Sequence, residues 1–349
     1  MDHPLSGAPE AGLSGRAEAS ALPEGWRGDW SGLRVAVLGL DAEGFAAADT
    51  LAELGAQLLV LGSAPDEDRE RVLAVLGVPV LVAAQAAERA AALAAHRPEL
   101  VVASSAAAEE DLRSASALGV PLWGEADLAW RLRDKAVRAG AAGPAPWLLV
   151  TAGSPRVASA VVDLAALLLE AGELRVAPCG AAGTPVLDAV RDPEGFDVLL
   201  VELSPSRLAL LQEQVRPWAS ACAGGADAEA GRLLARVYRN TEAACLYDRG
   251  DARTEDYVRE AEVVEGARAI GVGLDAPGPS ELGVVDGILC DRAFLAERAH
   301  SALELCTLGE LAASGRPVDP GSVAVVLFAS ALARSAGVPA AAIHAVLSS

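Results

Sequence analysis

Short apolar runs alternate with helix-forming stretches along the first half of the chain, and this alternation constrains the fold more than any other feature. The apolar runs at 34–40 and 57–62 are separated by a helical stretch that ends at Gly55. Further apolar runs follow at 79–84, 100–104 and 121–124. Such a pattern is typical of a parallel sheet whose strands are joined by covering helices. The sequence therefore predicts an α/β fold that begins with a Rossmann-like, doubly wound domain over residues 33–133.

A second α/β domain is predicted over residues 147–349. The segment 134–146 shifts to Gly, Ala and Pro, which is typical of a linker between domains. Strand candidates of the second domain are the runs at 147–150, 196–203, 219–225, 243–248 and 267–274. The dipeptide Asp286-Gly287 predicts a β-hairpin over 282–291, because both residue types adopt positive φ readily.

The chain begins with residues of low apolar content, and its composition points to a reducing compartment. Residues 1–32 are rich in Ala, Gly, Pro and Ser and lack the basic start and apolar block of a secretion signal, so we expect a flexible leader. No apolar run approaches the ~20 residues that span a bilayer. The five cysteines are widely spaced without a C-x-x-C pair. We therefore expect a cytoplasmic protein with no membrane partner.

Charge and residue usage exclude several kinds of site. The formal net charge is −20, from 48 acidic and 28 basic residues, which argues against a nucleic-acid partner. Lys135 is the single lysine, so any chemistry that needs a lysine must use it or do without. The four histidines lie far apart in the sequence, which argues against a histidine-rich metal site.

The stretch VTAGSPRVAS at 150–159 has the layout of a phosphate-binding loop, because it joins an apolar run to a long amphipathic helix. A working loop of this kind places a glycine beside a lysine, followed by a hydroxyl residue. Here Pro155, Arg156 and Val157 occupy those positions. Pro155 has no backbone N–H, Arg156 is planar and bulkier than lysine, and Val157 has no hydroxyl for a metal ion. The sequence thus predicts a degenerate loop kept for its shape.

Several segments together resemble the Mur ligases of peptidoglycan synthesis, and most closely the members that add D-glutamate. They are collinear from about residue 33 to 347 and include GVPLWGEADLAWRLR (119–133), FDVLLVELS (196–204) and LGVVDGILCDRAFLAERAHSALEL (282–305). The resemblance implies a UDP-binding N-terminal domain, a central domain that holds ATP and magnesium, and a C-terminal ligase domain, which we expect to be absent. It also implies a reaction in which ATP and a carboxylate form an acyl phosphate that the amine of D-glutamate attacks.

The resemblance assigns candidate residues in the central domain. The nucleotide-binding positions are Thr151, Gly153, Ser154 and Arg156, in the degenerate loop. Glu202 matches the family's magnesium carboxylate and is the candidate catalytic residue. The family's metal-binding histidine is missing from 222–231, Leu234 stands where a carbamylated lysine is expected, and the substrate-contacting segment 180–183 lacks its asparagine. We therefore expect no intact metal site and neither ATP nor magnesium bound.

The resemblance also assigns candidate UDP-sugar residues in the N-terminal domain, which are Gly39, Gly44, Ser104, Gly124 and Glu125. Asp41 and Glu43 stand where a diphosphate would approach, and two carboxylates there repel an anion.

Two hypotheses follow. One is a divergent paralogue without ATP-dependent ligase activity, which acts as a binding, scaffold or regulatory protein with a UDP-N-acetylmuramoyl-type ligand or a cell-wall enzyme as partner. The alternative is an active ATP-dependent ligase that adds D-glutamate to UDP-N-acetylmuramoyl-L-alanine, or a related ligase that needs another subunit.

Overall fold

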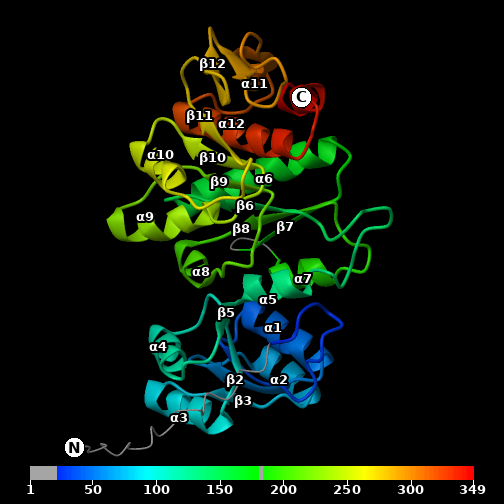
Figure 1. The fold of residues 1–349 in the computed structure, drawn as a ribbon, viewed down its shortest axis with the longest axis vertical. Coiled ribbons are helices and arrows are strands. Elements are labelled where there is room, and N and C mark those ends of the chain that lie inside the picture. The colour runs from blue at the N-terminus through cyan, green and yellow to red at the C-terminus, as the bar shows by residue number, and fades with distance from the viewer. Residues whose placement is uncertain (1–21, 181–183) are drawn as a thin grey trace, which may run out of the picture.

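The computed structural model describes residues 22–180 and 184–349 of the chain, and the predicted leader up to residue 21 and Ala181, Ala182 and Gly183 of the substrate segment lie outside the described residues. Two β-sheets, each flanked by helices, lie one above the other along the long axis of the molecule (Figure 1). The predicted α/β class is therefore confirmed. The division into domains at 33–133 and 147–349 encloses one sheet each, and its exact boundaries stay a prediction.

The N-terminal sheet is parallel throughout, with the strand order β3-β2-β1-β4-β5. Its strands are β1 (Arg34–Leu38), β2 (Gln57–Gly62), β3 (Val80–Val82), β4 (Leu100–Ala103) and β5 (Leu122–Gly124). Its helices are α1 (Ala42–Glu53), α2 (Glu67–Val75), α3 (Ala86–His96), α4 (Glu109–Ala117) and α5 (Glu125–Leu132). The chain order reverses at β1, which lies between β2 and β4. In open parallel sheets this reversal leaves a crevice at the carboxyl ends of the two strands, where ligands bind.

The central sheet has the order β14-β13-β12-β11-β10-β9-β6-β8-β7. Its parallel strands are β6 (Trp147–Thr151), β7 (Val176–Gly180), β8 (Val198–Glu202), β9 (Ala219–Cys222), β10 (Ala244–Asp248), β11 (Arg268–Val272) and β12 (Glu281–Val285). Two antiparallel strands, β13 (Ile288–Asp291) and β14 (Leu303–Thr307), extend one edge. The β12–β13 hairpin turns at Asp286 and Gly287, with φ of 50° and 79°, which confirms the predicted turn.

Two layers of helices cover the central sheet. Helices α6 (Pro155–Ala171), α12 (Pro320–Ser335) and α13 (Ala340–Leu347) pack together on one side (Figure 1). The remaining elements are α7 (Val186–Arg191), α8 (Pro205–Leu210), α9 (Ala228–Leu234), η1 (Ala235–Tyr238), α10 (Ala252–Arg259) and α11 (Leu308–Ala313). Alternate residues of β6 serve different cores: Leu148 and Val150 pack with α6 and α12, while Trp147 and Leu149 share a core with the N-terminal domain.

Both edge strands of the central sheet, β7 and β14, escaped the sequence analysis for a physical reason. Strand β7 contains Pro178, which lacks an N–H and is tolerated because β7 has a neighbour on one side only. Strand β14 reads Leu-Glu-Leu-Cys-Thr, with Leu303 and Glu304 exposed. Edge strands carry weaker apolar patterns than buried central strands, and so they give weaker sequence signals.

Polar contacts and a shared core join the two domains. Arg191 of α7 donates to Asp49 at 2.7 Å and to Glu53 at 2.9 Å, both on α1. Trp130 of α5 meets Trp147 of β6 edge to face, with ring centroids 5.1 Å apart. The Arg191 ion pairs and the Trp130–Trp147 contact together fix how the carboxyl ends of the N-terminal sheet face the central domain. Within the described residues, no helix is long and apolar enough to cross a membrane.

Residues 22–32, which the sequence analysis assigned to the leader, belong to the folded body. Trp30 is buried at 1% exposure in the N-terminal core, and its indole N–H donates to the carbonyl of Gly25 at 3.1 Å. The backbone N–H of Trp26 donates to Asp134 at 2.7 Å. The leader prediction is therefore wrong for these residues. The stretch has few apolar residues overall, but two tryptophans, Trp26 and Trp30, attach it to the folded body.

Replacing Trp30 tests this correction. Trp30→Ala removes a fully buried indole, so we expect a loss of about 3–5 kcal/mol in the free energy of unfolding, measured by denaturant titration. Val75→Ala, at a position that is 84% exposed, is the control and should change stability by less than about 0.5 kcal/mol. A Trp30→Ala variant as stable as the control would mean that residues 22–32 do not pack on the core.

Candidate functional site

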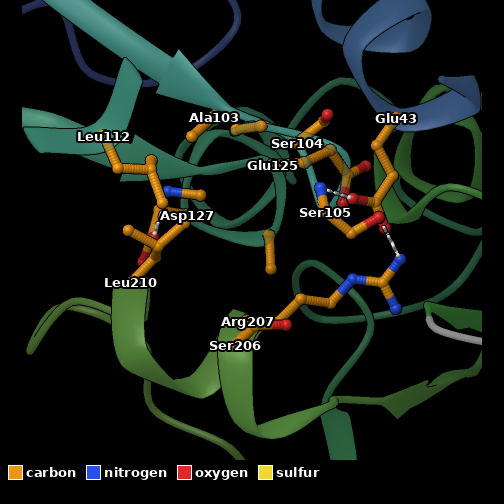
Figure 2. A pocket seen from close by; sticks show the side chains of 13 residues that line it. Glu43, Ala103, Ser104, Ser105, Leu112, Glu125, Asp127, Ser206, Arg207 and Leu210 are labelled. Carbon is orange, nitrogen blue, oxygen red and sulfur yellow. Dashed lines mark hydrogen bonds and ion pairs between the residues drawn. The ribbon is translucent and has the colours of Figure 1, made fainter. Parts of the chain in front are cut away.

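A pocket lies between the domains, at the carboxyl ends of β4 and β5 and beside the start of α1 (Figure 2). Its polar lining residues come from both domains and are Glu43, Ser104, Ser105, Glu125, Asp127, Ser206 and Arg207, with Gly124 beside them. The five predicted UDP-sugar residues are thus gathered in or next to this pocket: Gly39, Gly44, Ser104, Gly124 and Glu125. The crevice expected at the reversal of strand order is therefore present.

The two predicted glycines at this site are required by packing. Gly39 has a φ of +98°, and a Cβ there would lie 2.0 Å from the Ser104 hydroxyl oxygen. A Cβ on Gly44 would lie 2.2 Å from the carbonyl oxygen of Gly39. Both positions need glycine for the turn between β1 and α1 to close against β4. Their presence is explained by the fold, whether or not a ligand binds.

Two carboxylates at the start of α1 accept hydrogen bonds from the protein itself. Asp41 is the N-cap and accepts from the backbone N–H of Gly44 at 3.0 Å, which is one of the donors that a helix N-terminus offers to a phosphate. Glu43 accepts from the backbone N–H of Ser105 at 2.8 Å, and the Ser105 hydroxyl donates to Asp41 at 2.9 Å. Ser105 lies in the loop after β4, so these bonds join that loop to the start of α1.

Arg207 supplies the positive charge of the pocket and is paired within the protein. Its guanidinium forms an ion pair with Glu43 and joins α8 of the central domain to α1 of the N-terminal domain (Figure 2). Both side chains are largely buried, at 15% and 6% exposure. A buried pair of this kind is costly to break, because either charge left alone would be unpaired. Arg207 is therefore held by Glu43 and lies across the domain boundary.

Glu125 and Asp127 also connect the domains and are strongly buried. Glu125 accepts from the backbone N–H of Leu187 at 2.6 Å, and Asp127 accepts from that of Gln212 at 2.8 Å. Burial raises the pKa of Glu125 to about 8 and the pKa of Asp127 to about 6, with neighbouring carboxylates adding to the effect at Glu125. Glu125 is thus a neutral, interdomain hydrogen-bonding group at neutral pH.

The predicted phosphate loop has the expected strand–turn–helix frame, between β6 and α6. Pro155 is the first helical residue, and residues 153–156 are exposed. The backbone N–H groups of Val157 and Ala158 donate to the carbonyl of Ser154. The buried hydroxyl of Thr151 donates to the carbonyl of Leu203 at 2.7 Å, so it is engaged inside the sheet.

A second loop, residues 223–226, lies against the phosphate loop. The backbone N–H of Gly153 donates to the carbonyl of Gly224 at 2.9 Å, and a Cβ on Gly153 would lie 2.1 Å from the carbonyl oxygen of Gly225. Pro155 has no N–H. Of the backbone N–H groups from Gly153 to Ala158, those of Ser154 and Arg156 have no hydrogen-bond partner among the described residues. Too few donors face outward to surround a phosphate.

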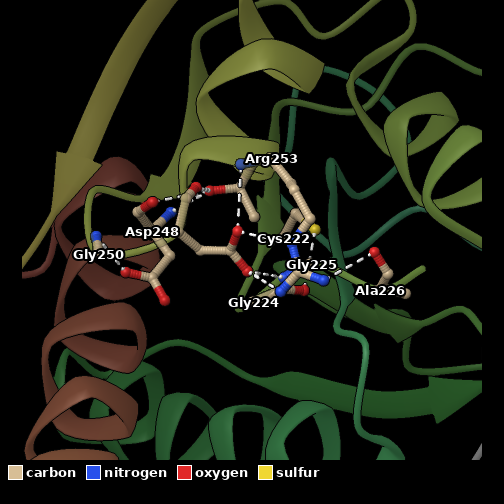
Figure 3. Close-up of polar contacts among 9 residues, drawn as sticks. Cys222, Gly224, Gly225, Ala226, Asp248, Gly250 and Arg253 are labelled. Carbon is tan, nitrogen blue, oxygen red and sulfur yellow. Dashed lines mark hydrogen bonds and ion pairs between the residues drawn. The ribbon is translucent and has the colours of Figure 1, made fainter. Parts of the chain in front are cut away.

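The 223–226 loop is held in place by an acidic and a basic side chain that follow β10 (Figure 3). Asp251 accepts from the backbone N–H of Gly225 at 2.9 Å, and Arg253 donates to the carbonyl of Ala226 at 2.9 Å. Arg253 also pairs with Asp251 at 2.7 Å, and these bonds hold the pKa of Asp251 down at about 2. The Asp251–Arg253 ion pair therefore holds the 223–226 loop in the position in which it contacts Gly153.

Glu202 ends β8 beside the phosphate loop, where the sequence analysis expected it. Its carboxylate is 4% exposed and accepts from the Ser159 hydroxyl at 3.1 Å. Burial raises the pKa of Glu202, and Asp163 raises it further. Leu234, at the expected carbamylated-lysine position, is fully buried in the core. At phosphate loops magnesium is held by a carboxylate and a hydroxyl, with waters and phosphates as its other ligands; here the hydroxyl of Ser159 is bonded to Glu202 itself.

Four polar residues of the pocket lining were not predicted from the sequence: Ser105, Asp127, Ser206 and Arg207. Asp127 carried a weak signal, because it is three residues after Gly124 and accepts from its backbone N–H. Arg207 carried none, since its partner Glu43 is far away in sequence and meets it only when the domains dock.

Comparison with known proteins begins with the fold. The structure matches that of UDP-N-acetylmuramate:L-alanyl-gamma-D-glutamyl-meso-diaminopimelate ligase from Neisseria meningitides with a TM-score of 0.53 and 13% identity, over 91% of this chain and 98% of that one. A murein peptide ligase from Psychrobacter arcticus matches with the same TM-score at 11% identity, over 91% of this chain and 68% of that one. The architecture is thus that of the Mur ligases. No protein-family model matches the chain.

Sequence comparison identifies the family within this class. The chain is 48% identical to UDP-N-acetylmuramoylalanine–D-glutamate ligase of Leifsonia xyli subsp. xyli, over 96% of this chain and 68% of that protein. The protein of the same name in Streptomyces avermitilis is 38% identical, over 90% of this chain and 66% of that protein. The chain therefore belongs to the family of UDP-N-acetylmuramoylalanine–D-glutamate ligases, which confirms the resemblance. It spans about two thirds of the length of these relatives.

The protonation of Glu125 predicts a pH dependence of stability. Its pKa of about 8 in the folded protein lies above the ordinary value of 4.5, so between these values the folded state keeps a proton that the unfolded state has lost. Stability from this group is therefore lost as pH rises through that window. Glu125→Gln keeps the acceptor for Leu187 without the ionisation. We expect the free energy of unfolding of Glu125→Gln, relative to that of the wild type, to rise by a few kcal/mol between about pH 5 and pH 8.

The control for this measurement is Glu229→Gln, an exposed carboxylate at the start of α9. Its profile of unfolding free energy against pH should run parallel to that of the wild type. Parallel profiles for Glu125→Gln and the wild type would contradict the burial of a neutral Glu125.

Proposed function

We propose that this chain is a member of the D-glutamate-adding Mur ligase family that does not transfer phosphoryl groups and acts as a binding or scaffold protein in peptidoglycan synthesis. The observation that carries this proposal is the contact of Gly153 with the 223–226 loop. It places backbone carbonyls, which carry partial negative charge, against the loop that would have to hold a triphosphate. Repulsion between carbonyl oxygens and phosphate oxygens opposes nucleotide binding there.

The chemistry of phosphoryl transfer supports the same conclusion. Catalysis of this step depends on positioning and on neutralising charge, with a lysine and metal ions against the phosphates. Lys135, the single lysine, lies in the predicted linker and pairs with Glu53 of α1 at 3.2 Å. Arg156 is exposed, and Glu202 has Ser159 as its hydrogen-bond donor. We propose that neither ATP nor magnesium binds at this loop.

The interdomain pocket is the candidate site for a UDP-N-acetylmuramoyl-type ligand. Asp41 accepts from the Gly44 N–H at the start of α1, Glu43 accepts from the Ser105 N–H after β4, and the charges of both carboxylates oppose a diphosphate. A ligand of this type would have to displace the Glu43–Arg207 pair to reach Arg207. We therefore propose that the pocket serves mainly to join the domains, and that the folded two-domain body is what a cell-wall enzyme would recognise.

A second candidate function is D-glutamate ligation with the missing groups supplied from outside the described residues. The observation that favours it is the 48% identity to a named ligase together with the chain's span of about two thirds of that relative. In this case Glu202 would be a working metal ligand and the 223–226 loop would have to move away from Gly153.

A turnover assay separates the two. Purified protein receives ATP, Mg²⁺, UDP-N-acetylmuramoyl-L-alanine and D-glutamate, and phosphate release is measured against a blank without protein. We expect release at the level of the blank. Glu202→Ala tests whether turnover comes from this site, and Glu170→Ala, at an exposed position near the end of α6, is the carboxylate control. Turnover above the blank that Glu202→Ala abolishes and Glu170→Ala leaves intact would overturn the proposal in favour of the ligase.

A further inference from the structure

A cluster of three potential metal ligands lies at the end of the central domain far from the interdomain pocket. Cys306 is on β14, Glu310 on α11 and His344 on α13. One donor atom from each, the thiol sulfur, a carboxylate oxygen and a ring nitrogen, lies within 4.8 Å of the others. Helix α11 and the C-terminal end of the chain meet at the top of the molecule in Figure 1. Three separate elements thus bring soft and borderline ligands to one point.

The distances in the cluster suit a tetrahedral ion. The Cys306 sulfur lies 3.7 Å from one oxygen of Glu310, and the His344 Nε2 lies 3.7 Å from the other. Zinc bonds of about 2.0–2.3 Å place neighbouring tetrahedral ligands roughly 3.3–3.6 Å apart. The Cys306 and His344 contacts end on different oxygens of Glu310, and the three donor atoms, which lie within 4.8 Å of one another, would have to draw closer together to share an ion.

The histidine ring is oriented as a metal-binding histidine is. Its Nδ1 lies 3.1 Å from the carbonyl oxygen of Leu305, an acceptor, so Nδ1 carries the proton in the neutral ring. Nε2 then presents its lone pair toward the carboxylate of Glu310. A backbone carbonyl that fixes the tautomer in this way is the usual outer contact of zinc-bound histidine. An imidazole nitrogen and a carboxylate that face each other can share a cation, either a proton or a metal ion.

Glu310 is held in place independently of any ion. The backbone N–H and the hydroxyl of Thr307 both donate at 2.8 Å to the same Glu310 oxygen, the one near the Cys306 sulfur, in a capping box at the start of α11. These bonds lower the pKa of Glu310. The oxygen on the other side faces His344. The cluster is thus preorganised through Thr307, which would have the role of an outer support.

We propose that Cys306, Glu310 and His344 form a binding site for zinc, or another borderline-soft divalent cation, with a fourth position open. The thiol lies on the inner side, and the side chains of Glu310 and His344 are 39% and 42% exposed, which gives the ion a path from solvent. On binding, Cys306 releases its proton to solvent and a sulfur–metal bond forms. Magnesium and calcium are disfavoured, because thiolate and imidazole are poor ligands for hard cations. The bound ion would tie β14, α11 and α13 together.

Cobalt(II) titration of the full chain tests the site. Tetrahedral cobalt bound to thiolate absorbs visible light and also shows a sulfur-to-metal charge-transfer absorption band. We expect the bands to saturate at one equivalent and to disappear when zinc is added. Cys306→Ser and His344→Gln should each abolish the sulfur band or weaken zinc affinity at least 10-fold. Cys290→Ser, in the neighbouring strand β13, is the matched control and should bind as the wild type does.

Two results would overturn the proposal: absence of the sulfur band in the wild-type protein, or a band that survives in Cys306→Ser. Thermal unfolding without metal keeps the test valid, since a variant that unfolds at the wild-type temperature has lost ligands and not structure. Zinc should raise the melting temperature of the wild type and of Cys290→Ser but not that of His344→Gln.

Discussion

The hydrogen bond from the backbone of Gly153 to the carbonyl of Gly224 is the contact on which the account of this protein depends. It brings the turn after β6 against the turn after β9, and the Asp251–Arg253 pair supports it from behind. Parallel strands require these turns to meet at one edge of the sheet, so the two loops compete for the same space. In this chain a hydrogen bond joins the two loops, and we propose that a phosphate would have to displace this contact.

The same principle operates at the N-terminal domain. A helix N-terminus next to a β-strand attracts anions, and here Asp41 and Glu43 provide the anions from within the chain. Arg207 then neutralises Glu43 and locks the two domains together. Positions where the fold offers donors to a ligand are thus filled by protein groups at both ends of the interdomain region. The fold of the family is retained because its glycines, strands and apolar faces are needed for packing.

Much of the fold could be predicted from the sequence, because its signals are local. Glycine at 55 ends α1, Asp286 and Gly287 turn the hairpin, and the apolar runs of the buried parallel strands are continuous. Residues 22–32 could not be predicted, since two tryptophans in a polar stretch give no periodicity. The candidate loop could be predicted from its strand–turn–helix frame, and Glu202 from the resemblance to the Mur ligases. The 223–226 contact, the Arg207 pair and the Cys306–Glu310–His344 cluster join residues distant in sequence, so only the tertiary structure brings them together.

Calorimetric titration with ATP and Mg²⁺ tests the central claim most directly, because it asks only whether the loop after β6 holds a nucleotide. Wild-type protein and the Arg156→Ala variant would be titrated side by side, since Arg156 is the one cation in that loop. The account predicts no saturable heat for either protein. Saturable one-to-one binding by the wild type, weakened in Arg156→Ala, would contradict it.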